Sequence, residues 1–98
     1  MWLDDKRAMP PGFDVHVLRA DHAIELLRGG LVTAISLDHD LGDEALCGTG
    51  YDVAKEIEAL AHAGTLRRII VHLHTQNPVG LANMKAAIMS AERFWQRH

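Results

Sequence analysis

The sequence has 98 residues with 13 acidic and 10 basic side chains, which gives a formal net charge of −3. A chain of this length forms one domain, residues 1–98, and its 48 % apolar content is typical of a folded globular protein. The slightly acidic balance and the scattered basic residues argue against an extended nucleic-acid-binding track. The single cysteine, Cys47, excludes a disulfide framework and a cysteine zinc site, and it fits a reducing cytoplasm.

No apolar run in the sequence approaches the ~20 residues that a membrane span requires. The chain opens directly on Met1 and Trp2 followed by acidic residues, so we expect no signal peptide. These features predict a cytoplasmic protein that does not bind membranes.

The first part of the chain predicts two short strands joined by a loop. Residues 1–4 are an apolar run that ends in paired acids, and residues 14–18 alternate between apolar and polar side chains. The segment between them, residues 6–12, contains two consecutive prolines, which cannot continue a hydrogen-bonded ladder.

The middle of the chain predicts a helix, a strand and a glycine-rich loop. Asp21 is expected to cap the helix, which has an apolar face and is stopped by a Gly-Gly pair at 29–30. Residues 32–37 form a continuous apolar strand, and residues 42–50 with their three glycines form the loop.

Two further helices and one strand are predicted after this loop. Thr49 and Asp52 have the spacing of a capping box, and a helix with apolar residues at helical spacing follows them. Residues 69–74 form the fourth strand. Asn77 is expected to cap the last helix, residues 78–95, because proline at the first helical position follows it.

Apolar strands that alternate with helices indicate an α/β domain of two or three layers, with a four-stranded, mainly parallel sheet and three helices. The connection between the first two strands is unusual, because a parallel crossover usually needs a dozen or more residues and few separate Asp5 from Asp14. The direction and pairing of the second strand are therefore left open.

Polar clusters follow three of the four predicted strands. They are Asp4-Asp5, Asp38-His39-Asp40, and His74-Thr75 with Asn77. The carboxyl ends of parallel strands share one edge of a sheet, where ligands bind, so these clusters are expected to meet. Carboxylates gathered in one crevice repel one another, and a bound cation removes that conflict. Oxygen ligands without cysteine suit Mg²⁺, Mn²⁺ or Ca²⁺ better than zinc, although acids after a strand are often only loop residues or helix caps.

Other residues at this edge are candidates for phosphate chemistry. His39 and His74 stand at strand ends, whereas His72 has the pattern of a half-buried strand residue. Arg7 and Thr75 have the side chains to bind phosphate oxygens, and each is equally well explained as a solvated residue.

Four sequence strings resemble the cyclic-phosphate-processing receiver-like family, which is related to the receiver domains of bacterial response regulators. They are Trp-Leu-Asp-Asp-x-Arg (2–7), Ile-Ser-Leu-Asp-His-Asp-Leu-Gly (35–42), Gly-Tyr-Asp (50–52) and His-Thr-x-Asn-Pro-x-Gly (74–80). They occur in order and at compatible element boundaries, and the likeness covers nearly the whole chain. The resemblance implies a small receiver-like, flavodoxin-like domain.

The resemblance also implies roles for individual residues. Asp4, Asp5 and Asp38 match the receiver acids that hold Mg²⁺, and Asp38 matches the one that accepts a phosphoryl group in receivers. Asp40, His39 and His74 match the additions that set the cyclic-phosphate family apart. Arg7, Thr75 and Asn77 fall within matched strings as phosphate-binding candidates. The implied metal ligands are Asp4, Asp5, Asp38 and Asp40.

The chain departs from an ordinary receiver in two places. A loop replaces the first helix, and the fifth strand with its lysine is missing; Lys6, Lys55 and Lys85 lie in other elements. These losses weaken a signalling role. They are also expected to leave one face of the sheet thinly covered, which favours a homodimer.

The leading hypothesis is a hydrolase, a metal-assisted phosphodiesterase that opens the cyclic phosphate of a nucleotide or an RNA end. His74 is assigned as base and His39 as acid, or the reverse, with Asp38 in the catalytic set and Asp4 and Asp5 holding the cation. Alternatives are a metal-free enzyme, a stand-alone receiver-like module phosphorylated on Asp38, and a degenerate receiver fold used for protein contacts.

Overall fold

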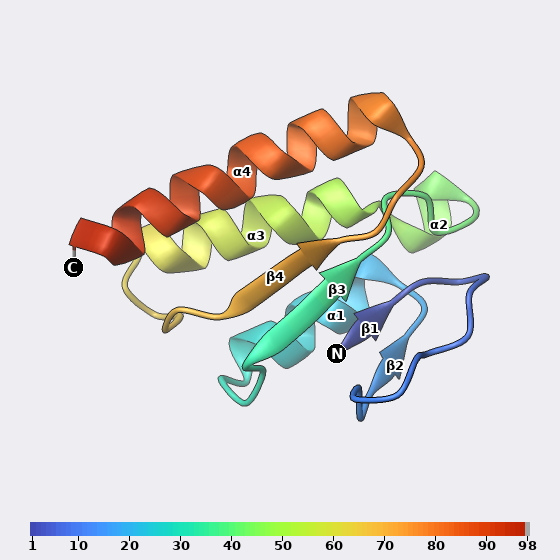
Figure 1. Cartoon of the computed structure of the whole chain (residues 1–98), viewed down its shortest axis with the longest axis horizontal. Coiled ribbons are helices and arrows are strands. Elements are labelled where there is room, and N and C mark those ends of the chain that lie inside the picture. The colour runs from blue at the N-terminus through green and yellow to red at the C-terminus, as the bar shows by residue number, and fades with distance from the viewer. Residues whose placement is uncertain (98) are drawn as a thin grey trace.

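A computed structural model, which describes residues 1–97, has four parallel strands in one sheet with the order β2-β1-β3-β4 (Figure 1). The strands are β1 (Trp2–Leu3), β2 (His16–Val17), β3 (Ala34–Leu37) and β4 (Ile70–Leu73). Each lies inside a segment that the sequence predicts as a strand. The sheet is parallel throughout, and β2 pairs with β1.

Four helices alternate with these strands along the chain. They are α1 (Ala20–Arg28) after β2, α2 (Glu44–Cys47) and α3 (Gly50–His62) after β3, and α4 (Pro78–Arg97) after β4. Three of them are the predicted helices. The fourth, α2, is a single turn inside the predicted glycine-rich loop, too short to leave a periodic apolar pattern. The architecture confirms a receiver-like α/β fold that lacks the first helix of a receiver, and the described residues form no fifth strand.

The caps at the starts of the helices agree with the sequence in two of three cases. Thr49 and Asp52 form the predicted capping box on α3, and Asn77 Oδ1 accepts the backbone N–H of Gly80 in the first turn of α4. Asp21 was predicted as a cap and is not one, because α1 begins at Ala20 and places Asp21 within the first turn. There its carboxylate bonds to Arg19 and still suits the positive end of the helix.

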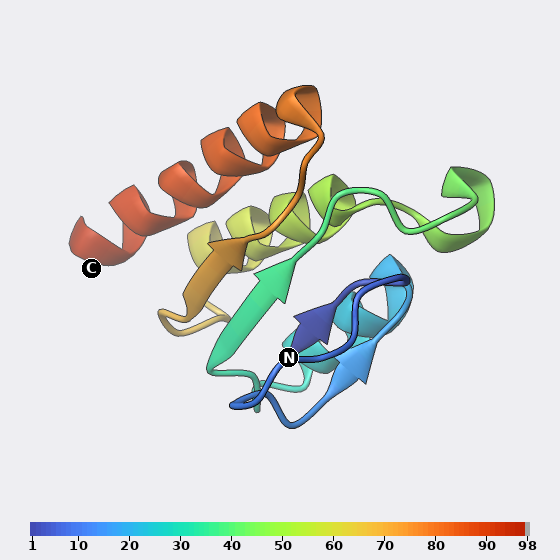
Figure 2. The same ribbon diagram turned by 45° about the vertical axis from the view of Figure 1, so that its right-hand side comes forward.

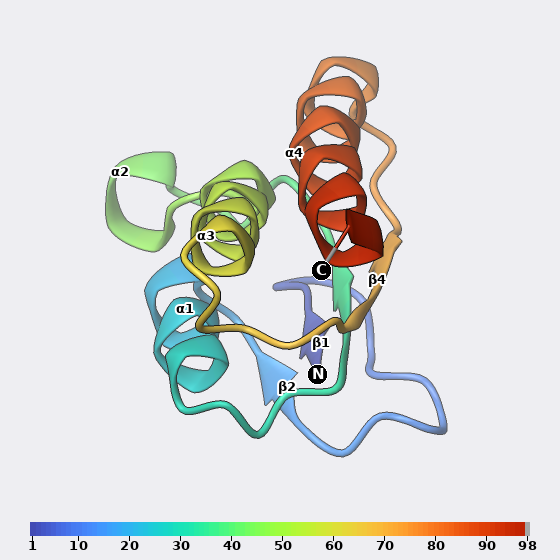
Figure 3. The same ribbon diagram turned by 90° about the vertical axis from the view of Figure 1, so that its left-hand side faces the viewer.

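The three long helices cover one face of the sheet. The crossovers from β2 to β3 and from β3 to β4 run in the same direction across the sheet, so right-handed connections place α1 and α3 on the same side. The helix α4 packs alongside α3, and Figure 3 shows all three helices on that side. The domain is therefore two-layered.

The loop between β1 and β2, residues 4–15, occupies the opposite face in place of a helix. Because both strands are only two residues long, more chain is left for the crossover than the sequence suggests. Trp2 N–H donates to Val15 O at 2.8 Å and Asp4 N–H to Val17 O at 3.2 Å, which fixes the parallel pairing. Figure 2 shows this loop passing beside β1 on its way to β2.

The core lies between the sheet and the helices, where Leu3, Ile35, Leu37, Ile57 and Met84 are fully buried. Burial of such side chains stabilises the fold by about 1.5–3 kcal/mol each. No helix among residues 1–97 is long and apolar enough to cross a membrane.

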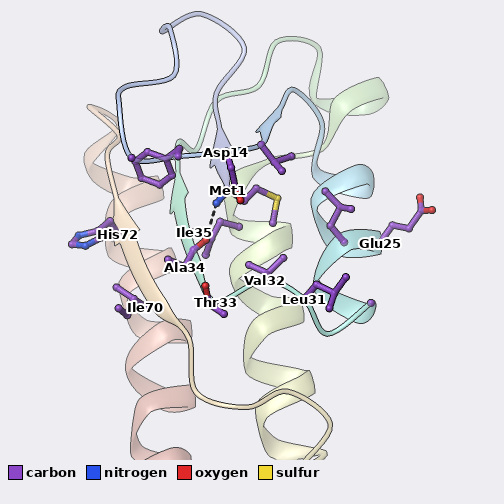
Figure 4. Close-up of a pocket in the computed structure, with 15 residues that line it drawn as sticks. Met1, Asp14, Glu25, Leu31, Val32, Thr33, Ala34, Ile35, Ile70 and His72 are labelled. Carbon is purple, nitrogen blue, oxygen red and sulfur yellow. Dashed lines mark hydrogen bonds between the residues drawn. The ribbon is translucent and has the colours of Figure 1, made fainter.

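The open face of the sheet continues into an apolar groove of about 820 Å³ at the amino-terminal ends of the strands (Figure 4). Leu31 is 92 % exposed there and Ile70 63 %. His72 is exposed on this side, so the expectation of a half-buried histidine is wrong. The homodimer stays a prediction, and a monomer mass near 10.8 kDa by light scattering at micromolar concentration would contradict it.

Candidate functional site

Three carboxylates meet at the carboxyl ends of β1 and β3. The register pairs Leu3 with Leu37, so Asp4 and Asp38 are neighbours in the next row, where Asp38 N–H donates to Leu3 O at 3.0 Å. Asp4, Asp5 and Asp38 each place one carboxylate oxygen within 4.8 Å of the others. The parallel topology thus brings together acids that are more than 30 positions apart in the chain, as the sequence predicts.

Asp4 is fully buried and has partners on both carboxylate oxygens. Oδ1 accepts the backbone N–H groups of Lys6 at 2.8 Å and Arg7 at 2.9 Å, while Oδ2 lies 3.0 Å from His74 Nε2. Burial by itself would raise the pKa of Asp4, but these hydrogen bonds outweigh it and hold the pKa below its usual value. Asp4 is therefore a carboxylate that only accepts hydrogen bonds.

Asp5 differs, because its buried Oδ1 has no hydrogen-bond partner among the described residues. A buried carboxylate oxygen without a donor is costly, and the neighbouring Asp4 and Asp38 add like-charge repulsion. A divalent cation would relieve both penalties. The donor set is all oxygen, so these three residues fit Mg²⁺, Mn²⁺ or Ca²⁺.

The structure does not bring Asp40, the fourth predicted metal ligand, into this cluster. Its side chain is 65 % exposed and lies 2.8 Å from His39 Nδ1, with Asn77 Nδ2 at 3.3 Å from the same oxygen. The hydrogen bond from His39 and then that from Asn77 lower the pKa of Asp40. Because Asp40 is ionised and accepts only, His39 carries its proton on Nδ1, which leaves Nε2 as the ring's basic nitrogen.

Two glycines let the chain close around His39. A Cβ at Gly80 would collide with the His39 ring, so glycine allows the first turn of α4 to pack against it. A Cβ at Gly50 would collide with the backbone oxygen of Asp38, and Gly50 N–H donates to His39 O at 2.9 Å. Both positions require the absence of a side chain because of close approach.

His74 is held at both ring nitrogens. Nε2 faces Asp4, and Nδ1 lies 2.7 Å from the hydroxyl of Ser36. The imidazole is stacked on the Trp2 ring with centroids 3.9 Å apart and an interplanar angle of 6°. The periodicity of the sequence does not distinguish Ser36 or Trp2 from an ordinary strand residue, although both fall within the strings that resemble the family.

The Arg7 side chain extends across the edge of the sheet and is only partly exposed to solvent. Its Nη1 donates to His74 O at 2.6 Å and lies 3.7 Å from Asp4 Oδ2. The side chain is 43 % exposed. Its guanidinium thus combines an anchoring contact with access to solvent, which is suitable for meeting an anion at the site.

A cavity of about 490 Å³ opens at this edge. It is lined by predicted site residues and by two that the sequence analysis did not single out; the lining is Asp4, Lys6, Arg7, Asp38, Asp40, Thr75, Gln76 and Asn77. Lys6 and Gln76 were missed because an isolated polar loop residue carries no pattern. His39 and His74 stand behind this lining, bonded to Asp40 and Asp4.

This combination defines a class: a parallel α/β domain whose acidic cluster and phosphate-binding candidates share the carboxyl edge of the sheet. The model of the Cyclic-phosphate processing Receiver domain family matches residues 1–90, and the chain belongs to that family. No curated protein and no solved structure matches the chain. The family's description connects the domain with cyclic-phosphate processing.

Proposed function

We propose that this protein is a hydrolase that opens a cyclic phosphodiester, such as a nucleoside 2′,3′-cyclic phosphate or the cyclic phosphate at an RNA end. The observation that carries the proposal is the single cavity in which Asp4 and Asp38 face the basic residues Lys6 and Arg7. Its volume of about 490 Å³ is in the range of small-molecule sites. The family membership supports a cyclic phosphate as the ligand.

The basic and polar side chains would bind the phosphate. Arg7 and Lys6 supply positive charge, and the Thr75 hydroxyl and Asn77 amide, which also line the cavity, supply hydrogen bonds. Asn77 also caps α4 and bonds to Asp40, so its orientation is fixed before a ligand arrives. The net charge of −3 and the scattered basic residues favour a small or terminal phosphate over a long nucleic acid as the ligand.

Asp4, Asp5 and Asp38 would hold a divalent cation. When bound, such a cation supplies positive charge that stabilises the negative charge developing on the phosphate oxygens. The unpartnered Oδ1 of Asp5 supports this role, and the exposed position of Asp40 favours a different one, the orientation of His39.

The histidine geometry favours His39 as the base, which is the reverse of the first assignment made from the sequence. Its Nε2 would take the proton of the attacking water as the new P–O bond forms. His74, protonated on both ring nitrogens, would then give its Nε2 proton, held beside Asp4, to the ring oxygen that leaves as the old P–O bond breaks, and would become neutral. The product is a phosphate monoester with one free hydroxyl.

The experiment is turnover of a nucleoside 2′,3′-cyclic phosphate by the wild type and by His39→Ala and His74→Ala variants. Each proton-transfer group is worth about 10²- to 10⁴-fold in rate, and each variant should lose that much. His22→Ala, which removes an exposed histidine from α1, is the matched control and should retain full activity. Full activity in the His39→Ala/His74→Ala double variant would overturn the mechanism.

The other hypotheses predict different results in the same samples. Turnover that survives exhaustive chelation would select a metal-free reaction. A stable, acid-labile adduct of about 80 Da on Asp38 after exposure to a small phosphodonor, without turnover, would select the phosphorylated receiver-like module.

A further inference from the structure

Ser36 is a buried polar residue in an otherwise apolar strand. Its residue exposure is 2 %, and it lies on β3 on the face away from the helices, in register with Trp2 on one side and His72 on the other. Its hydroxyl is 2.7 Å from Nδ1 of His74, which directly follows β4 and lies two residues past the register partner of Ser36. A buried hydroxyl in such a position needs a hydrogen-bond partner, and His74 supplies it.

The direction of this hydrogen bond follows from the other side of the ring. The Asp4 carboxylate can only accept, so the proton between it and His74 is on Nε2. In the neutral ring Nδ1 is then the acceptor, and the Ser36 hydroxyl must donate to it. The series Ser36–His74–Asp4 therefore selects one tautomer of the imidazole.

Trp2 fixes the plane of the same ring. The indole lies parallel to the imidazole at 3.9 Å between centroids, and its own position is set by the loop that follows β1. Trp2 Nε1–H donates to Arg7 O at 3.2 Å, and Arg7 Nη1 donates to His74 O at 2.6 Å. Trp2, Arg7 and His74 are thus each in contact with the other two. Phe13 also contacts the indole edge-on.

We propose that Ser36 and Trp2 are positioning residues, which hold the His74 ring at Nδ1 and in the plane that directs its Nε2–H to Asp4 at the cavity. The catalytic meaning of this role rests on the proposed function. The arrangement itself is a property of the folded protein and can be measured without substrate.

The test is ¹⁵N NMR of the histidine rings at one fixed alkaline pH, at which the wild-type ring nitrogen shifts themselves identify His74 as neutral. The signature expected for wild-type His74 is the Nε2–H form with an Nδ1 resonance shifted by the hydrogen bond from Ser36. Ser36→Ala should lose this Nδ1 shift while Asp4 keeps the proton on Nε2, and Ser36→Thr, which restores a hydroxyl, should recover it. Ser90→Ala is a matched control, because Ser90 also bonds to a histidine, His62 Nε2 at 3.0 Å, but far from the site.

Kinetics provide a second readout in the same variants. Loss of a partner that orients a histidine costs about 10- to 100-fold in activity, so Ser36→Ala should lower kcat by that factor with KM nearly unchanged. Trp2→Phe should weaken the NMR signature less, because a phenyl ring can still stack. Should Ser36→Ala unfold, Ser36→Cys, which has a weaker donor of similar size, gives the same readout.

The outcomes separate the two proposals. A His74 signature that is unchanged in Ser36→Ala or in Ser36→Cys would overturn the positioning role. A wild type that shows the signature and its loss in Ser36→Ala, but no turnover on any cyclic phosphate, would support the arrangement and contradict the proposed function.

Discussion

Lys6 is the side chain on the cavity wall that the sequence analysis placed outside any functional element. It follows the acid pair, lines the cavity with Arg7, and its charge contributes to the lowered pKa of Asp40. A residue in this position should attract an anionic ligand and contribute little to the fold.

We expect Lys6→Ala to raise KM for a cyclic phosphate by about 10-fold with a smaller effect on kcat, the value of roughly one charge-assisted hydrogen bond. Lys85→Ala, which removes an exposed lysine from α4, is the matched control and should leave KM unchanged. Steady-state kinetics at fixed ionic strength make the comparison. An unchanged KM in Lys6→Ala would exclude it from the binding wall.

The substitution Gly80→Ala tests whether close packing of α4 against His39 is needed for activity. Alanine would favour the helix by about 1 kcal/mol over glycine, but its Cβ collides with the imidazole, and overpacking of this kind costs about 1–3 kcal/mol. Gly80→Ala should therefore be no more stable than the wild type in urea and should lose most of its activity.

Asn83→Ala, at an exposed position of the same helix, changes helix propensity without contacting His39 and serves as the control. A stable, fully active Gly80→Ala variant would mean that the position of His39 is not important for the reaction.

At the scale of elements, the start of α3 supports the loop that carries Asp40. Thr49 caps the helix through Asp52, and the same residue forms an isolated bridge with Asp40. Thr49→Ala should lower the free energy of unfolding by about 1 kcal/mol and the melting temperature by about 4–8 °C. Asp21→Ala, which removes an exposed acid that is not the cap residue of α1, should lower the urea midpoint less; equal losses in both variants would refute the assignment.

The sequence predicts the strands and the meeting of Asp4, Asp5 and Asp38, because a parallel sheet brings the carboxyl ends of its strands to one edge. It does not predict which acid pairs with which histidine. The His74–Asp4 bond joins residues 70 positions apart and depends on the lateral order of the strands. Ser36 could not be found either, because its role is defined only by the residue two places beyond its register partner.

A local sequence pattern also gives a wrong prediction where the same residue type fits two structural roles. Asp21 satisfies the pattern of a cap, yet the cap position of α1 is Arg19, two residues earlier, and the buried Ala20 is the first residue of the helix. Asp40 belongs to an acid-histidine-acid string, and only the turn after β3 decides that it faces His39 instead of the other carboxylates. Packing of the whole molecule decides both.

At the scale of the whole molecule, cation binding should stabilise the fold. A ligand present at 100 times its Kd adds about 2.7 kcal/mol, which for a domain of this size raises the melting temperature by about 10 °C or more. We expect such a rise with Mg²⁺, Mn²⁺ or Ca²⁺ in the wild type and none in Asp38→Asn, measured by differential scanning calorimetry.

The melting temperatures without metal provide a second comparison of the wild type with Asp38→Asn. Asp38→Asn removes one charge from three crowded carboxylates, so without metal it should melt at or above the wild-type temperature. Asp14→Asn, an exposed acid at the other end of the sheet, should keep the wild-type response to metal. A metal-induced rise that persists in Asp38→Asn would place the cation elsewhere.

The most direct test of the central claim is ³¹P NMR of a nucleoside 2′,3′-cyclic phosphate incubated with the purified protein and Mg²⁺. The account predicts that the cyclic phosphate signal is replaced by that of a phosphate monoester, and that Asp38→Asn and His39→Ala leave it in place. A cyclic phosphate signal that persists unchanged with folded wild-type protein, for nucleoside and RNA-end substrates alike, would contradict it.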